Sequence, residues 1–216
     1  AAILGMISLW LIIFTSSVAV YGFTDSDSDE STQINYFNEY GRTKYEAELV
    51  YKQWQEEDPE NRCLTIIRPT VIFGEGNRGN VYNLLNQIWS KRFLMVGNGD
   101  NIKSMAYVEN VAAVIQHCFK FKPGLHIFNY VDKPDLDIAS LILKIRKSMF
   151  GASGLGLRVP LFVGYIGGYI FDFLSIFLNQ EFPISSIRIK KFISSTQFSS
   201  SNDIGFTAPI SIEEGL

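Results

Sequence analysis

Tyr40 and Lys44 have the residue types and the spacing of a general acid–base pair. They are the first and last residues of the segment YGRTK, and residues four positions apart lie on the same face of an α-helix. The positive charge of a lysine favours the phenolate form of a nearby tyrosine. Tyr40 is therefore a candidate general base that could later return the proton as an acid. The same spacing also occurs by chance, as a surface pair of an aromatic residue and a lysine.

Ser16 and Ser17 place hydroxyl groups upstream of this pair, directly after an apolar run at residues 9–15. Such a continuous run is typical of a buried strand in a parallel sheet. Open parallel sheets bind ligands at the carboxyl ends of their strands. A serine at this place could hydrogen-bond the substrate oxygen that Tyr40 would deprotonate. A second strand-like run ends in the same way, in the segment IIRPTVIFG at residues 66–74.

Alternating strand and helix patterns surround these residues and indicate an α/β fold with a parallel sheet. The apolar spacing predicts helices over residues 36–57, 80–91, 109–120 and 137–150, and strands over residues 9–15, 62–68, 103–108 and 125–131. The helix at 36–57 would present both Tyr40 and Lys44. The acidic segment DSDSDE at residues 25–30 is expected to be a solvated connector.

The composition excludes several classes of protein. The chain has 216 residues, of which 47% are hydrophobic and 19% charged, so it can bury a sizeable core. A net charge of −3 argues against a basic binding face, and we predict no nucleic-acid partner. Two cysteines and two histidines provide few potential ligands for a zinc site, so we predict no metal. So few cysteines suit a reducing compartment, and we predict a cytoplasmic protein.

Two apolar segments raise the question of membrane contact. Residues 1–24 carry no charge, but their most apolar part is shorter than the ~20 residues of a membrane span. We expect a buried helix end at residues 1–8, followed by the strand at 9–15. Residues 160–178 are interrupted by three glycines and contain Asp172. For this segment we expect a buried or interface-packed helix, with membrane contact as the less favoured alternative.

Four segments in order resemble the extended short-chain dehydrogenase/reductases, and in particular the NAD-dependent epimerase/dehydratase branch, which acts mainly on nucleotide-activated sugars. They are SSVAVYG, YGRTK, IIRPTVIFG and VGNGDNIKSMAYVENV, the last at residues 96–111. The resemblance extends from about residue 11 to the last residue. It implies the C-terminal part of a Rossmann-like parallel sheet, without the first strands and the glycine loop. It also implies a small mixed α/β subdomain that binds the substrate.

By this resemblance, Ser17, Tyr40 and Lys44 are the catalytic residues. Ser17 would bind the reacting hydroxyl, and Tyr40 would be the base. Lys44 would hold the nicotinamide ribose of the cofactor, NAD or NADP, so Tyr40 and Lys44 would both contact the cofactor. The implied chemistry is hydride transfer between a sugar carbon and the cofactor, while Tyr40 takes the hydroxyl proton.

The resemblance also implies residues that line the cofactor and the substrate. Further cofactor contacts are expected at Ser16, Pro69 and Val71, and contacts with a nucleotide-diphosphate sugar at Ser17, Asn80, Val81 and Lys103. Lys103 stands where many relatives carry a diphosphate-binding arginine; a lysine keeps the charge but lacks the bidentate fork. Many dehydratases of the family carry Asp-Glu after the serine position, where this chain has Val18 and Ala19. We therefore predict an epimerase or a reductase.

Two other functions stay open at this point. One is an oxidoreductase similar to the 3β-hydroxysteroid dehydrogenases, which share the triad and often have apolar C-terminal segments like residues 160–178. Lys103 favours a diphosphate ligand and hence the sugar. The other is a non-catalytic remnant or interaction protein that keeps the fold without the cofactor site.

The family's glycine turn, G-x-x-G-x-x-G after a first strand, is not found upstream of Ser16. The glycines at residues 151–156 follow a predicted helix, so we do not take them as its equivalent. We expect a fragment of a longer chain, or the product of a disrupted gene, with impaired cofactor binding. The expected organisation is a partial Rossmann domain over residues 1–130, with a substrate-loop insertion around 74–108, and a C-terminal subdomain over 131–216. The family implies a homodimer if a full-length chain exists.

Overall fold

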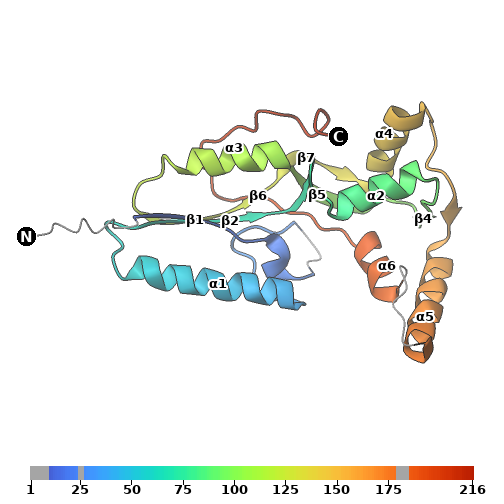
Figure 1. The fold of residues 1–216 in the computed structure, drawn as a ribbon, viewed down its shortest axis with the longest axis horizontal. Coiled ribbons are helices and arrows are strands. Elements are labelled where there is room, and N and C mark those ends of the chain that lie inside the picture. Colours follow the sequence, from blue (N-terminus) through green and yellow to red (C-terminus); the bar gives the residue numbers. More distant parts are fainter. Residues whose placement is uncertain (1–9, 24–26, 179–184) are drawn as a thin grey trace, which may run out of the picture.

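The computed structural model describes residues 10–23, 27–178 and 185–216 (Figure 1), and the helix expected at residues 1–8 lies outside these ranges. The helices are α1 (Glu39–Glu56), α2 (Asn80–Trp89), α3 (Val108–Cys118), α4 (Ile138–Phe150), α5 (Leu161–Leu178) and α6 (Ser186–Ile193), with a short 3-10 helix, η1 (Val18–Tyr21). The strands are β1 (Leu11–Thr15), β2 (Cys63–Pro69), β3 (Val71–Phe73), β4 (Met95–Val96), β5 (Ile102–Tyr107), β6 (Gly124–Tyr130), β7 (Asp132–Asp137) and β8 (Arg158–Val159).

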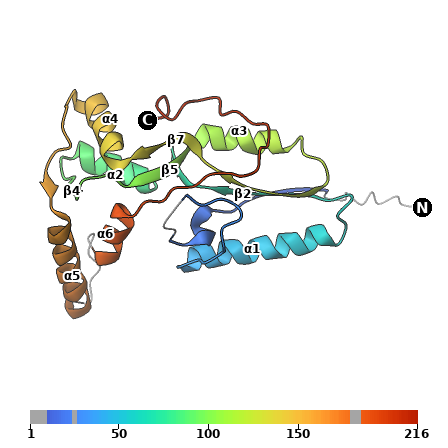
Figure 2. The same ribbon diagram turned by 180° about the vertical axis from the view of Figure 1, so that it is seen from behind.

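A parallel sheet with the strand order β1-β2-β6 carries the predicted catalytic residues. The central strand β2 is buried along its whole length, which explains its largely apolar sequence. Helix α1 lies on one face of this sheet and α3 on the other (Figure 1 and Figure 2). Because Thr15 pairs with Ile67, the carboxyl ends of β1 and β2 lie side by side.

A second sheet, with the order β3-β5-β7, combines parallel and antiparallel pairing. It packs with α2 and α4 around a core that includes Phe73, Ile88, Met105 and Ile142. The short strands β4 and β8 form a separate parallel pair. The apolar pattern did not indicate β3, β4, β7 or β8. The division into a Rossmann part at residues 1–130 and a subdomain at 131–216 stays a prediction.

The predicted helices and strands on both sides of Tyr40 are present, with shifted ends. Helix α1 begins at Glu39 rather than at residue 36, because the Asn38 side chain accepts a hydrogen bond from Gly41 N and caps the first turn. The described part of the acidic segment at 25–30 is anchored rather than solvated. Ser28 is buried, and Glu30 accepts hydrogen bonds from backbone and hydroxyl groups of residues 129, 200 and 201.

The predicted helix at residues 160–178 is present as α5, which packs against α6 on one side and has one exposed face. Tyr169, Phe173 and Phe177 of that face are exposed. Figures 1 and 2 show α5 at the periphery of the molecule, beside α6. None of the helices in the described part of the chain combines the length and the apolar character needed to cross a bilayer.

Candidate active site

Tyr40 and Lys44 lie one turn apart at the start of α1. The Nζ atom of Lys44 is 5.9 Å from the centre of the Tyr40 ring and 5.2 Å from the centre of the Phe14 ring. It donates a hydrogen bond of 2.8 Å to the carbonyl oxygen of Thr15, the last residue of β1. This bond holds the ammonium group at the carboxyl end of the strand. The structure therefore brings the predicted acid–base pair together at an edge of the sheet where ligands bind in such folds.

Ser17 lies next to the first turn of α1. Its Oγ caps η1 by accepting a hydrogen bond of 3.1 Å from Ala19 N. Gly41 allows η1 and α1 to approach each other, since a Cβ at this position would lie 2.5 Å from the carbonyl oxygen of Ala19. A glycine is required at such a distance. The close approach places η1, which Ser17 caps, against the first turn of α1, which carries Tyr40.

The chemical groups of this pair are accessible. The Tyr40 side chain is 54% exposed, and its phenol oxygen has no hydrogen-bond partner in the described part of the chain. Lys44 carries three N–H donors, of which Thr15 occupies one. A phenol and two ammonium donors without partners among the described residues fit the hydroxyl groups of a nicotinamide ribose. These two residues can therefore hold the ribose of NAD.

Glu48 forms a buried polar network beneath the site. It lies one turn after Lys44 on α1 and is fully buried. Its Oε1 accepts hydrogen bonds from Ser16 Oγ at 2.6 Å and from Arg68 Nε at 2.9 Å, and its Oε2 accepts one from Arg68 Nη2 at 2.6 Å. Ser16 precedes Ser17, and Arg68 precedes Pro69. Glu48 thus connects the helix of Tyr40 with the ends of both β1 and β2.

Arg68 extends this network to Tyr21 and Asn129. Its Nη1 donates to Tyr21 Oη at 2.7 Å, and Tyr21 donates to Asn129 Oδ1 at 2.9 Å. Burial raises the pKa of Tyr21, although the positive charge of Arg68 acts in the opposite direction. Burial alone would lower the pKa of Arg68, but its bonds to Glu48 raise the pKa overall, so the guanidinium stays charged.

Sequence reasoning did not identify Glu48 or Arg68 as part of the site. Two weak signals were present. Glu48 follows Lys44 by four residues and therefore lies on the same helix face. Arg68 is a charged residue at the end of an otherwise apolar strand, where an unpaired charge would be costly.

The residues predicted to line the cofactor lie at the same edge of the sheet. Pro69 ends β2 and Val71 begins β3, with Thr70 between them. Thr70 Oγ1 is buried and has no hydrogen-bond partner among the described residues. The Ser16 hydroxyl is occupied by Glu48 inside the protein. The cofactor contacts of Ser16, Pro69 and Val71 stay predictions.

The residues predicted to contact the substrate have different environments. Asn80 is exposed at the start of α2, whereas Val81 is packed in the core. Lys103 Nζ donates hydrogen bonds to the carbonyl oxygens of Lys191 at 2.9 Å and Ser194 at 2.6 Å, at the end of α6. Burial lowers the pKa of Lys103 to about 8. In this structure Lys103 stabilises a helix end, and its contact with a diphosphate stays a prediction.

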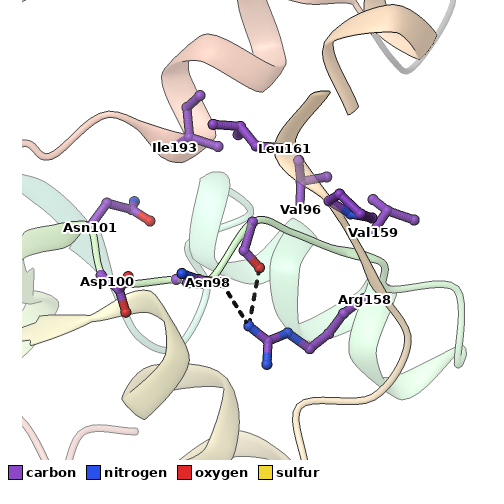
Figure 3. A pocket seen from close by; sticks show the side chains of 11 residues that line it. Val96, Asn98, Asp100, Asn101, Arg158, Val159, Leu161 and Ile193 are labelled. Carbon is purple, nitrogen blue, oxygen red and sulfur yellow. Dashed lines mark hydrogen bonds between the residues drawn. The ribbon is translucent and has the colours of Figure 1, made fainter. Parts of the chain in front are cut away.

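A pocket of about 670 Å³ opens beside the β4–β8 pair (Figure 3). It is lined by residues 96–101 and 158–161 and by Ile193. Arg158 Nη2 donates to Asn98 Oδ1 at 3.2 Å and to the carbonyl oxygen of Gly97 at 3.5 Å. None of the predicted catalytic residues lines this pocket, so it is separate from the tyrosine site.

Sequence comparison relates the chain to a known family. The NAD dependent epimerase/dehydratase family model matches residues 5–129, which is more than half of the chain. N-acetyl-alpha-D-glucosaminyl-diphospho-ditrans,octacis-undecaprenol 4-epimerase of Escherichia coli O157:H7 is 47% identical over 208 residues. The match covers 95% of this chain and 62% of the relative. The chain thus spans less than two thirds of that relative's length.

Structural comparison gives the same fold. UDP-glucuronic acid 4-epimerase from Bacillus cereus, in complex with NAD, matches with a TM-score of 0.70 and 15% identity, over 97% of this chain and 60% of that chain. UDP-N-acetylglucosamine 4-epimerase from Bacillus cereus matches with a TM-score of 0.69 and 14% identity, over 94% of this chain and 62% of that chain. These matches confirm the predicted Rossmann-like α/β fold. The chain belongs to the NAD-dependent epimerase/dehydratase family.

Proposed function

We propose that this chain contributes the tyrosine-dependent catalytic site of an NAD-dependent 4-epimerase, whose substrate is an N-acetylhexosamine linked to a diphosphate. The observation that carries this proposal is the arrangement of Ser17, Tyr40 and Lys44 at the end of β1. The relative that is 47% identical is a 4-epimerase of a diphosphate-linked N-acetylglucosaminyl group, which supports both the reaction and the sugar.

The side chains suit reversible oxidation of a secondary alcohol. When bound, NAD supplies the hydride acceptor and donor. The phenolate of Tyr40 takes the proton of the sugar C4 hydroxyl, while the Ser17 hydroxyl hydrogen-bonds the same oxygen. The Lys44 ammonium stabilises the negative charge on Tyr40. Tyr40 returns the proton to that oxygen when hydride has been added to the opposite face of the carbon, which completes the inversion at C4.

The group beyond the diphosphate differs between the relatives. It is undecaprenol in the E. coli relative and uridine in the Bacillus cereus enzymes. The reacting sugar is N-acetylglucosamine in the E. coli relative and in one of the two Bacillus cereus enzymes, and glucuronic acid in the other; a diphosphate is common to all three substrates. The test of function therefore includes one substrate of each kind.

The experiment replaces the matching segment of the E. coli relative with this chain. The chimera is given NAD with either UDP-N-acetylglucosamine or N-acetylglucosaminyl-diphospho-undecaprenol. We expect one substrate to be converted to its C4 epimer, an N-acetylgalactosamine derivative, without net consumption of NAD. Accumulation of NADH without an epimer would instead indicate a dehydrogenase. No change in either substrate, in a chimera that binds NAD, would favour a non-catalytic protein.

A further inference from the structure

The hydroxyl group of Ser16 is buried and is bound inside the protein. The residue is 2% exposed, and its Oγ donates a hydrogen bond of 2.6 Å to Oε1 of Glu48. A hydroxyl that donates to a carboxylate forms a short and strong bond, because the acceptor is charged. The family resemblance implied a cofactor contact for Ser16, whereas in this structure its one hydroxyl proton goes to Glu48. The bond ties the end of β1 to α1.

Glu48 lies on the same face of α1 as the two predicted catalytic residues. Tyr40, Lys44 and Glu48 follow one another at intervals of four residues, so they form one line along the helix. The last two of them contact consecutive residues at the end of β1. Lys44 Nζ donates to the Thr15 carbonyl oxygen at 2.8 Å, and Glu48 accepts from Ser16. The strand end is thus attached to the catalytic helix at two points, one helical turn apart.

The peptide group between Thr15 and Ser16 is held on both sides. Its carbonyl oxygen accepts the Lys44 ammonium, and its N–H donates a hydrogen bond of 2.7 Å to the Ile67 carbonyl oxygen of β2. The chain then continues into Ser17, whose backbone is extended before η1 begins. A movement of this peptide group would therefore shift the acceptor of Lys44 and the Ser17 hydroxyl together, because the two are adjacent in the chain.

Glu48 is a firm anchor for the strand end. Its two oxygens also accept hydrogen bonds from Arg68, at 2.9 and 2.6 Å, so the carboxylate stays paired when the Ser16 hydroxyl is removed. A buried charge that loses its partner is costly, but Ser16→Ala does not create one. The substitution therefore releases the strand end from α1 while the buried ion pair remains.

We propose that Ser16 is a positioning residue of the proposed reaction. Through its bond to the buried carboxylate it holds the end of β1 against α1. The Thr15 carbonyl oxygen then keeps the Lys44 ammonium near Tyr40. Ser17, the next residue of the chain, keeps its place as well. The inference rests on the proposed function, since it requires Tyr40 to act as the base.

The kinetics of the chimera with the E. coli relative test this role. We expect Ser16→Ala to lower kcat by about 10- to 100-fold, because a small displacement of reacting groups slows the chemical step. The Kd for NAD and the KM of the sugar substrate should stay at their wild-type values. A cofactor contact would give the opposite pattern, a weaker affinity for NAD with an unchanged kcat. That pattern would overturn the proposal.

Ser104→Ala is the matched control. Ser104 is 1% exposed, and its Oγ donates to Asp135 Oδ1 at 2.7 Å, so this variant also removes a buried bond from a serine to a carboxylate, in the other sheet. It should lose stability in urea unfolding but keep the wild-type kcat. Equal kcat values for the folded Ser16→Ala and Ser104→Ala proteins would mean that Ser16 serves stability alone, and would overturn the proposal.

A conservative variant provides a rescue. Ser16→Cys keeps nearly the same shape and a weak donor, so its kcat should lie between those of Ser16→Ala and the wild type. It also takes the place of Ser16→Ala in the comparison if the alanine variant does not fold. A kcat of Ser16→Cys equal to that of the wild type, in the absence of a folded alanine variant, would count against the hydrogen bond.

Chemical labelling tests the anchor without turnover. Acetic anhydride acetylates free amines, and the Lys44 ammonium must release the Thr15 carbonyl oxygen and a proton before it reacts. In the chimera without NAD, mass spectrometry should show several-fold faster acetylation of Lys44 in Ser16→Ala than in the wild type, with the exposed Lys120 as internal reference. Equal rates would overturn the anchor even in an active chimera. Faster labelling in a chimera that does not epimerise its substrate would support the anchor and contradict the proposed function alone.

Discussion

The carboxylate of Glu48 accepts hydrogen bonds from Arg68 through both of its oxygens, at 2.9 and 2.6 Å. The side chains of this ion pair are 0% and 5% exposed. Glu48 belongs to the helix of Tyr40 and Lys44, and Arg68 lies near the end of β2. The pair therefore fixes the position of the catalytic helix relative to the sheet. Ser16 shares the same carboxylate, so the Ser17 segment is held by the same contact.

Loss of the Glu48 charge should strongly destabilise the protein. Glu48→Gln leaves the Arg68 guanidinium buried without a counter-charge, and we expect the free energy of unfolding to fall by about 3–5 kcal/mol. Urea unfolding measures this change. The double variant Glu48→Leu/Arg68→Met removes both charges and should lose less stability than Glu48→Gln. A single variant as stable as the wild type would contradict the role assigned to the pair.

Gly41→Ala should destabilise the protein, although alanine is the better helix former. The added Cβ would lie 2.5 Å from the Ala19 carbonyl oxygen and would push α1 away from η1. Gly167→Ala is the matched control, because a Cβ there meets no atom within 4 Å. We expect the control to gain roughly 0.5–1 kcal/mol from helix propensity. Thermal unfolding compares the two variants, and equal gains would show that α1 and η1 do not need this close approach.

Lys103 should make a measurable contribution to the pH dependence of stability. Burial lowers its pKa to about 8, from an ordinary value of 10.5. Between these pH values the amine is neutral in the folded state and protonated in the unfolded state, so the unfolded state binds more protons. The free energy of unfolding contributed by Lys103 therefore rises with pH through this window.

The variant Lys103→Met isolates that contribution, since tyrosines and cysteines titrate alike in both proteins. We expect the wild type to gain stability relative to the variant between about pH 7.5 and about pH 9.5, as measured by urea unfolding. A difference that stays constant over this range would mean that the Lys103 amine titrates normally in the folded protein.

The sequence predicted the parts of the fold that are governed by local periodicity. The predicted alternation of strands and helices around Tyr40 is correct. The reason is that β2 is buried along its whole length and α3 on one face, so each shows its burial directly in its sequence of apolar residues. The spacing of Tyr40 and Lys44 correctly predicted that the two side chains lie close together, since residues four positions apart lie on the same face of a helix. The short strands β4 and β8 were not predicted, because two residues are too few to show a period.

Contacts distant in sequence could not be predicted in the same way. The carbonyl oxygen of Lys191 that Lys103 meets is 88 residues away, and no local pattern indicates it. The partner of Glu48 is 20 residues away, on another element. The exposed face of α5 could not be predicted either, because the hydrophobicity of a segment does not show which of its faces another element covers.

The most direct test of the catalytic site compares two substitutions on α1 in the chimera described above. Tyr40→Phe removes the phenol at the site, and Tyr51→Phe removes one further along the same helix. We expect Tyr40→Phe to lower kcat by about 10²–10⁴-fold with NAD binding unchanged, and Tyr51→Phe to keep wild-type turnover. A Tyr40→Phe enzyme that epimerises its substrate at the wild-type rate would contradict the role assigned to Tyr40.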